Sequence, residues 1–273
     1  MKIKKSLKIS LDKFINLSLY DNKSGFYMKK NPFGKKGDFI TAPTISNLFS
    51  EIIAIWVISF WEKIERPKKF NFVELGPGDG SLTRVLVRTF KKFPEFDKAV
   101  NIFLYEKSKL LIKTQKNVIK GNRVKWINNF SSIKKGPVVF FGNEFFDAIP
   151  IKQFSKNGKS LMEKCYMINS EGFHETFRMA SITDIKNISS YKSLNDSKFI
   201  EYPKLGLSEL DKIVKKISIL NGGLLLIDYG HLNQLNKNTL QAVKNNKRIN
   251  MNNIQKHLGM VDITSLVNFS LLR

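Results

Sequence analysis

A strand, a glycine-rich turn and the start of a helix are predicted to follow one another between Phe72 and Ser81. Glycines allow such a turn and let backbone amides approach a bound ligand closely. A dinucleotide-binding loop requires Gly-x-Gly-x-x-Gly, and Ser81 stands where its third glycine would be. A P-loop is also excluded, since no Gly-Lys-Ser/Thr follows. The candidate ligand-binding residues of this segment are Glu74, Gly76, Pro77, Gly78 and Gly80.

An acid two residues before Gly-x-Gly-x-Gly resembles motif I of the class I S-adenosylmethionine (SAM) methyltransferases, whose cofactor has no pyrophosphate. A second acid, Glu106, closes the next predicted strand. A carboxylate there is placed to accept hydrogen bonds from both ribose hydroxyls of the cofactor. The alternative is that Glu106 caps the helix beginning near Ser108, and the two roles are compatible. We therefore predict that SAM is bound by Glu74, Gly76, Pro77, Gly78, Gly80 and Glu106.

Three polar residues, Asn143, Glu144 and Asp147, follow the predicted strand Val138 to Phe141 within an otherwise apolar segment. Ligands of doubly wound sheets bind at the carboxyl ends of the strands. We therefore predict that these side chains lie near the cofactor's methyl group and take part in catalysis. Capping of the following helix is the alternative role, above all for Asp147.

Four parts of the chain closely resemble the MidA family of SAM-dependent methyltransferases. These parts are residues 37–43 with 49–51, residues 73–80, residues 143–150, and residues 226–231 with 239–242. Mitochondrial relatives in that family are complex I assembly factors that symmetrically dimethylate an arginine of a core subunit. The resemblance implies a SAM-dependent protein arginine N-methyltransferase. Its partner would be a protein substrate with a target arginine, in a respiratory complex I subunit or its bacterial equivalent. The chain departs from the family pattern at Thr44, Asn245, Asn246 and Asn268.

Guanidinium chemistry gives the polar side chains distinct expected roles. Carboxylates can orient a guanidinium by bidentate hydrogen bonds and accept its proton. We expect Glu144 to do so, with Asp147 supporting it and Asn143 fixing the geometry of methyl transfer. Further candidates for substrate contact, from an N-terminal lid, are Asp38, Phe39 and Glu51.

The aromatic loop around Phe33 and Phe39 is a candidate for that lid. The alternative is that these rings pack on the following helix. No metal site is expected, and Cys165, the only cysteine, excludes a disulfide within the chain and a multi-cysteine zinc site.

Apolar spacing predicts an α/β fold in which five strands alternate with helices. Strands that are apolar throughout indicate a parallel sheet covered on both faces, as in Rossmann-like class I methyltransferases. Ser10 and Ser46 are expected to cap the first two helices, and the second, apolar nearly all round, is expected to be buried. The predicted helices are 11–19, 47–64, 81–93, 108–120 and 207–219, and the strands are 71–75, 101–105, 124–127, 138–141 and 224–227.

We expect an N-terminal helical or lid region, residues 1–66, and a SAM-binding domain, residues 67–273. A β-rich insertion at about 151–205 would contain hairpin turns at Asn157-Gly158 and near Gly172. Residues 181–200 are polar and weakly patterned and are expected to form an exposed loop. The C-terminal hairpin that completes the sheet in relatives is expected to be missing, the chain being either short or a fragment.

Composition leaves two rival functions open. The 273 residues carry 46 Lys+Arg against 23 Asp+Glu, a net charge of +23, which suits a nucleic-acid methyltransferase. The excess is mostly Lys spread along the chain, and an Asn/Asp-Pro-Pro-Tyr/Phe motif is absent, so we expect nucleic acid not to be the partner. The other rival is a non-enzymatic assembly or binding factor that keeps the fold. No apolar run approaches the roughly 20 residues of a membrane span, and a cytoplasmic location is expected.

Overall fold

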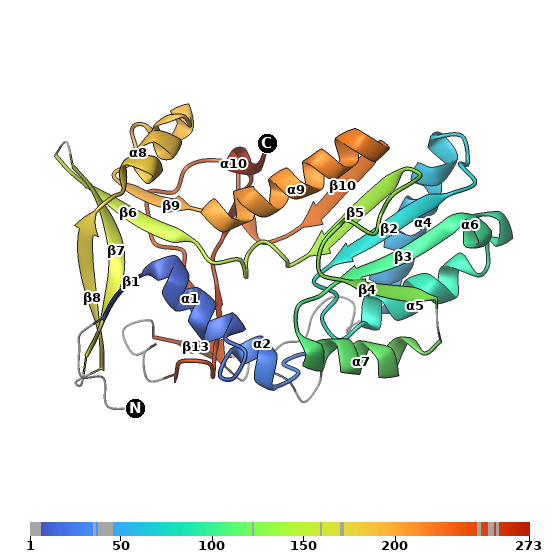
Figure 1. The fold of residues 1–273 in the computed structure, drawn as a ribbon, viewed down its shortest axis with the longest axis horizontal. Helices are drawn as coiled ribbons and strands as arrows, with labels where there is room; N and C mark the ends of the chain where they lie inside the picture. Colours follow the sequence, from blue (N-terminus) through green and yellow to red (C-terminus); the bar gives the residue numbers. More distant parts are fainter. Residues whose placement is uncertain are drawn as a thin grey trace. The chain divides into compact units, whose positions relative to one another are not determined.

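The computed structural model describes residues 7–34, 37, 46–121, 123–158, 160–169, 172–244, 247–250, 254 and 257–273. They form two compact units (Figure 1). The sheet unit comprises Tyr27–Phe145 and Asp211–Asp228, and the β-rich unit comprises the described residues before, between and after these two stretches. The expected boundary between residues 66 and 67 thus lies inside the sheet unit, because helix α4, Asn47–Lys63, packs on the sheet.

Five parallel strands form the sheet of the sheet unit in the order β10-β5-β2-β3-β4, which confirms the predicted α/β fold. The chain runs from β2 through β3 to β4 on one side of β2 and returns to β5 on the other side. The sheet therefore has its switch point between β2 and β5, where ligands of such sheets bind. The strands are β2 (Phe70–Leu75), β3 (Val100–Tyr105), β4 (Val124–Ile127), β5 (Val138–Asn143) and β10 (Gly222–Ile227).

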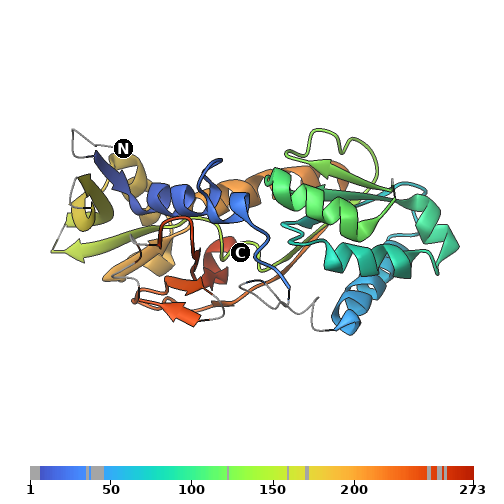
Figure 2. The same ribbon diagram turned by 90° about the horizontal axis from the view of Figure 1, so that it is seen from below.

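Figure 2 shows helices α7, α5 and α4 side by side, and their apolar side chains form one core with a face of the sheet. The opposite face is covered by Phe130, whose ring contacts Tyr105 and Phe140, and by the second half of α9 (Lys204–Leu220) around the buried Ile213. The predicted helix 81–93 ends early, because Pro94 starts a separate helix. The helices after α4 are α5 (Ser81–Phe90), α6 (Pro94–Ala99) and α7 (Lys109–Ile119).

Helix α4 begins as predicted, since the Ser46 hydroxyl accepts a hydrogen bond from Leu48 N at 3.1 Å. The expectation that α4 is buried all round is wrong. Leu48 and Ile52 are 61% and 58% exposed, whereas Ala54 and Val57 are fully buried. The reason is geometric, because a helix on the outside of a sheet contacts it along one stripe only.

The β-rich unit contains an antiparallel sheet in the order β1-β7-β6-β9, with β8 on the other edge of β7. Both predicted hairpins are confirmed. Ser10 pairs with Cys165 as the last residue of β1, and its side chain makes no cap bond, contrary to expectation. The elements are β1 (Leu7–Ser10), α1 (Leu11–Tyr20), β6 (Lys152–Asn157), β7 (Ser160–Asn169), β8 (Gly172–Met179) and β9 (Phe199–Tyr202), with the short α2 (Phe26–Lys29) at the unit boundary.

The expected loop at residues 181–200 is wrong. It contains helix α8 (Ile182–Ser189), a 3₁₀ turn and strand β9. Ser181 caps α8, and the apolar side chains of Ile188, Leu194 and Ile200 are buried. They lie in three different short elements, so no single helical or strand period over this segment reveals them.

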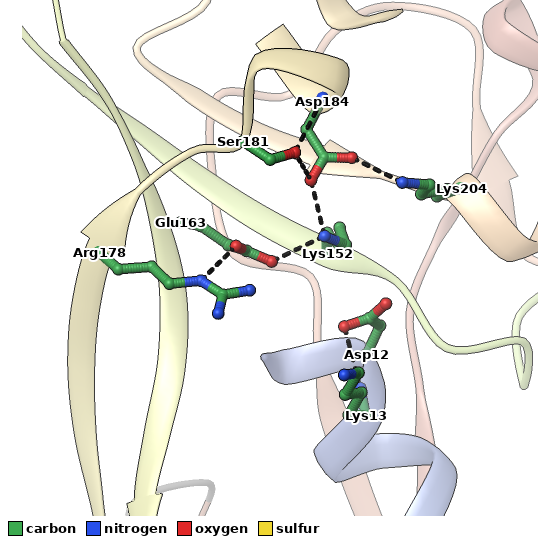
Figure 3. Close-up of polar contacts among 8 residues, drawn as sticks. All are labelled: Asp12, Lys13, Lys152, Glu163, Arg178, Ser181, Asp184 and Lys204. Carbon is green, nitrogen blue, oxygen red and sulfur yellow. Dashed lines mark hydrogen bonds and ion pairs between the residues drawn. The ribbon is translucent and has the colours of Figure 1, made fainter. Parts of the chain in front are cut away.

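A buried charge cluster joins β6, β7 and α8 in this unit (Figure 3). The Lys152 ammonium lies between Glu163 Oε1 at 2.8 Å and Asp184 Oδ2 at 2.7 Å. Arg178 and Lys204 bind the outer oxygens of these carboxylates, at 2.7 and 2.9 Å. The side chains of Glu163 and Asp184 are only 1% and 2% exposed, so the cluster is part of the unit's core.

Short elements that were not predicted follow β10, and in the described part of the chain β10 is an edge of its sheet. No described helix is long and apolar enough to cross a membrane. The elements are β11 (Gly230–His231), β12 (Gln241–Lys244), β13 (Lys247–Ile249), β14 (Asp262–Thr264), β15 (Val267–Asn268) and α10 (Phe269–Leu272).

Candidate active site

The glycine loop connects the carboxyl end of β2 to the start of α5. Gly76, Gly78 and Gly80 all have left-handed backbone, with φ of 60°, 55° and 86°. Gly76 N donates to Tyr105 O at 3.1 Å, and Gly80 N donates to Pro77 O at 2.9 Å. A β-carbon on Gly76 would lie 2.8 Å from the Phe145 ring, and one on Gly80 would lie 3.2 Å from Gln115 Cα. The Gly-x-Gly-x-Gly spacing of the sequence is therefore required by the backbone conformation of the loop and by its close packing against neighbouring residues.

Gly78→Val is expected to lower the affinity of the loop's ligand by at least about tenfold. A β-branched residue at φ 55° is strained by roughly 1–3 kcal/mol, and its side chain would project from the loop toward the ring of Phe33. Calorimetric titration with S-adenosylhomocysteine measures the effect. Gly121→Val is the control, because Gly121 has φ of 97° and open space around it. Equal affinity in wild type and Gly78→Val would contradict the loop's role.

Glu74 lies beneath this loop and is 4% exposed. Its carboxylate accepts a hydrogen bond from the Thr83 hydroxyl, which joins β2 to α5. Burial raises the pKa of Glu74 to about 7, although the Thr83 bond opposes the shift. Above about pH 7 the ionised carboxylate is therefore held at a cost in stability, which is typical of functional positions.

Glu74→Gln is expected to stabilise the ligand-free protein above pH 7 by about 1–3 kcal/mol. The folded-state pKa of Glu74 lies above the ordinary carboxyl pKa. The cost of ionising it is therefore absent below the ordinary pKa and complete above about pH 7. Urea unfolding at pH 5 and pH 8 measures it, with a clearly larger gain expected at pH 8. A gain of equal size at both pH values would show that ionisation of Glu74 is not its cause.

Glu106 follows β3, and its carboxylate fills the predicted capping role in part. Its Oε1 accepts hydrogen bonds from Lys107 N at 2.8 Å and Ser108 N at 2.7 Å, just before α7. Its Oε2 accepts from Gln115 Nε2 at 3.2 Å. Burial raises the pKa of Glu106, against the effect of these hydrogen bonds. The helix cap itself is Ser108, whose hydroxyl accepts from Leu111 N.

Gln115 was not predicted as part of this site. It is fully buried, and its amide also donates to Gly78 O at 2.8 Å. The sequence does hold a signal, because Leu111, Gln115 and Ile119 form the buried stripe of α7 and only Gln115 is polar. A polar residue on an apolar stripe requires hydrogen-bond partners.

Asn143 is the last residue of β5 and Glu144 follows it, beside the end of β10. Asn143 pairs with Ile227, and Glu144 N donates to Ile227 O at 2.8 Å. Glu144 has left-handed backbone, with φ of 50°, and its Oε1 accepts from Asn143 Nδ2 at 3.4 Å. Burial and the charge of Asp228 raise the pKa of Glu144, while the Asn143 bond lowers it. Asp228 was missed by the sequence analysis, although it follows a predicted strand just as Glu106 does.

The structure places the other candidates as follows. Asp147 belongs to the β-rich unit, where its carbonyl accepts from Ser265 N at 3.0 Å. Glu51 lies on α4 and pairs with Arg88 of α5 at 2.9 Å. Phe33 lies against Gly78. Asn268 caps α10 by accepting from Ser270 N. The candidates outside the described residues are Asp38, Phe39, Thr44, Asn245 and Asn246.

Residues 52–273 match the model of a family described as S-adenosyl-L-methionine-dependent methyltransferases. The chain belongs to this family. It is 31% identical over 272 residues to the mitochondrial "Protein arginine methyltransferase NDUFAF7 homolog" of Caenorhabditis elegans, covering 90% of this chain and 62% of the relative. It is 27% identical to the NDUFAF7 protein of Homo sapiens, covering 100% of this chain and 66% of the relative. The chain thus spans about two thirds of the length of these relatives.

The fold agrees with the crystal structure of a superfamily member from Burkholderia thailandensis bound to S-adenosyl-homocysteine. The TM-score is 0.79 at 21% identity, covering 97% of this chain and 70% of that chain. The predicted family and the cofactor SAM are therefore confirmed. The residues present fit this cofactor, since the glycine loop permits close backbone approach and the Glu106 carboxylate is an acceptor suited to ribose hydroxyls. In the described part of the chain, no group of three or more His, Cys, Asp or Glu is arranged to hold a metal ion.

Proposed function

We propose that this methyltransferase transfers a methyl group to a nitrogen of an arginine side chain in a protein substrate. The observation that carries the proposal is the pair of carboxylates at the ends of two adjacent strands, Glu144 after β5 and Asp228 after β10. Two carboxylates suit a cationic guanidinium, which offers several N–H donors in one plane. The relatives are named protein arginine methyltransferases, which supports the same acceptor. The expected substrate is a respiratory complex I subunit or its bacterial equivalent.

The reaction is an in-line displacement. When bound, SAM supplies an electrophilic methyl carbon on a sulfonium sulfur. The arginine nitrogen forms a bond to this carbon while the carbon–sulfur bond breaks, and the bonding pair remains on sulfur. Holding the reactants in line contributes about 7–11 kcal/mol. This positioning is the main contribution of the chain.

Glu144 has two tasks in this proposal. Its carboxylate orients the guanidinium and accepts the proton that leaves the attacking nitrogen. The raised pKa of Glu144 makes it a stronger base than an exposed glutamate. Asn143, bonded to Oε1, fixes the direction of the carboxylate, and Asp147 remains the predicted supporting acid.

The net charge of +23 opposes the approach of an arginine-rich partner. Charges farther apart than about 8 Å are screened at physiological salt, so the local carboxylates decide which side chain is held. The excess positive charge on the rest of the surface affects the encounter rate more than the bound geometry.

The test is a transfer assay with methyl-labelled SAM, the purified chain and an arginine-containing complex I subunit. Acid hydrolysis of the product should yield label in methylarginine, and replacing the target arginine with lysine should abolish it. Label in lysine or in added RNA would overturn the proposed acceptor. Cofactor binding without transfer to any protein would favour the non-enzymatic assembly factor.

A further inference from the structure

The buried amide of Gln115 connects three elements of the sheet unit. Its Nε2 donates to Gly78 O of the glycine loop at 2.8 Å and to Glu106 Oε2 after β3 at 3.2 Å. Its Oε1 accepts from Trp126 Nε1 of β4 at 2.8 Å. Gln115 is 0% exposed, so water does not compete for these bonds.

Trp126 determines which way this amide faces. The indole N–H can only donate, so the amide oxygen must face Trp126 and the amide nitrogen must face the loop and Glu106. Both amide hydrogens then have acceptors, Gly78 O and Glu106 Oε2. A fully bonded, buried amide has one orientation. It therefore holds its two acceptors, Gly78 O and Glu106 Oε2, in fixed positions.

We propose that Gln115 is a positioning residue for the nucleoside part of the cofactor. It fixes the glycine loop at the carbonyl of Gly78 and holds the Glu106 carboxylate in the rotamer that accepts from the ribose hydroxyls. Gln115 acts through these two groups and not by touching the ribose. The proposal rests on the predicted ribose contact of Glu106 and is independent of which acceptor is methylated.

The test compares S-adenosylhomocysteine with its 2′,3′-dideoxy analogue by calorimetric titration. Wild type is expected to prefer the ribose ligand by at least about tenfold, since the hydroxyls donate to a charged acceptor. Gln115→Met should reduce this preference several-fold, and Glu106→Gln should bring it close to one. Lys113→Met, an exposed position on the same helix, should leave the preference unchanged.

A merely structural role for Gln115 would weaken both ligands equally and leave their ratio at the wild-type value, which would overturn the proposal. Trp126→Phe provides a second route if Gln115→Met does not fold, because it removes the N–H that orients the amide and keeps an aromatic ring at this position. Trp126→Phe should also reduce the preference for the ligand with an intact ribose. An absent preference in wild type, or one that Glu106→Gln leaves intact, would also overturn the proposal, and neither result bears on arginine as the acceptor.

Discussion

Glu144→Gln is expected to lower the rate of methyl transfer by about 100- to 10,000-fold, the usual contribution of a positioned general base. Glutamine keeps the size of the side chain and its bond to Asn143, but it can neither accept a proton nor balance the charge of a guanidinium. The affinity for S-adenosylhomocysteine should remain within about threefold, because the residues predicted to bind the nucleoside lie at the ends of β2 and β3. Single-turnover rates and calorimetry measure the two quantities separately.

Glu95→Gln is the matched control for this substitution. Glu95 belongs to the same unit, its side chain is 76% exposed, and it pairs with Arg66 at the surface at 3.3 Å. Glu95→Gln should leave both the rate of methyl transfer and the affinity for S-adenosylhomocysteine unchanged. Transfer by Glu144→Gln at the wild-type rate would exclude Glu144 as clamp and base.

The pH dependence of the rate gives an independent check on Glu144. Burial and the charge of Asp228 raise its pKa, so activity should fall as the pH drops through a value above the ordinary carboxyl pKa of about 4.3. Asp228→Asn removes a like charge, lowers the pKa of Glu144 and should move the acidic limb to lower pH. If the acidic limb of the pH–rate profile does not move in Asp228→Asn, a group other than Glu144 is responsible for it.

The sheet and its loops could be predicted because their signals are local. Each central strand is a short apolar run, and the positive φ values at Gly76, Gly78 and Gly80 require the residue type found there. The acids Glu106 and Glu144 were found because each directly follows such a strand. Asp228 satisfies the same rule, since it directly follows β10.

Features that depend on distant partners were not predictable in this way. A strand such as β1 is defined by its pairing with β7, more than 150 residues later in the chain. The exposed side of α4 depends on how much of the helix the sheet covers. Gln115 requires partners from three separate segments, and only its position on the apolar stripe of α7 indicated them.

The charge cluster around Lys152 illustrates the same point and provides the largest expected effect on stability. Lysine in a strand normally predicts a solvated face, yet Lys152 is 8% exposed. Its two carboxylate partners lie 11 and 32 residues further along the chain. Burial alone would lower the pKa of Lys152, but the hydrogen bonds from its ammonium to Asp184 and Glu163 outweigh this and raise it.

Lys152→Met is expected to lower the free energy of unfolding by about 3 kcal/mol, because it leaves two buried carboxylates without their shared cation. Lys204→Met is the matched control, since Lys204 binds the same Asp184 carboxylate but its side chain is 39% exposed. It should cost less than about 1 kcal/mol. Urea unfolding followed by circular dichroism measures both. Equal losses in the two variants would show that burial of Lys152 does not set the strength of the cluster.

Acid should weaken the same cluster. Burial would raise the pKa of Asp184, but the bonds from Lys152, Lys204 and Ser181 outweigh it and lower the pKa below the ordinary value. The stabilisation is therefore complete above the unfolded pKa of about 3.9 and is lost as the pH falls through the folded value. Asp184→Asn should be less stable than wild type at pH 7, and the difference should shrink toward pH 2. A difference that stays constant with pH would mean that packing, and not the ionised carboxylate, explains the loss.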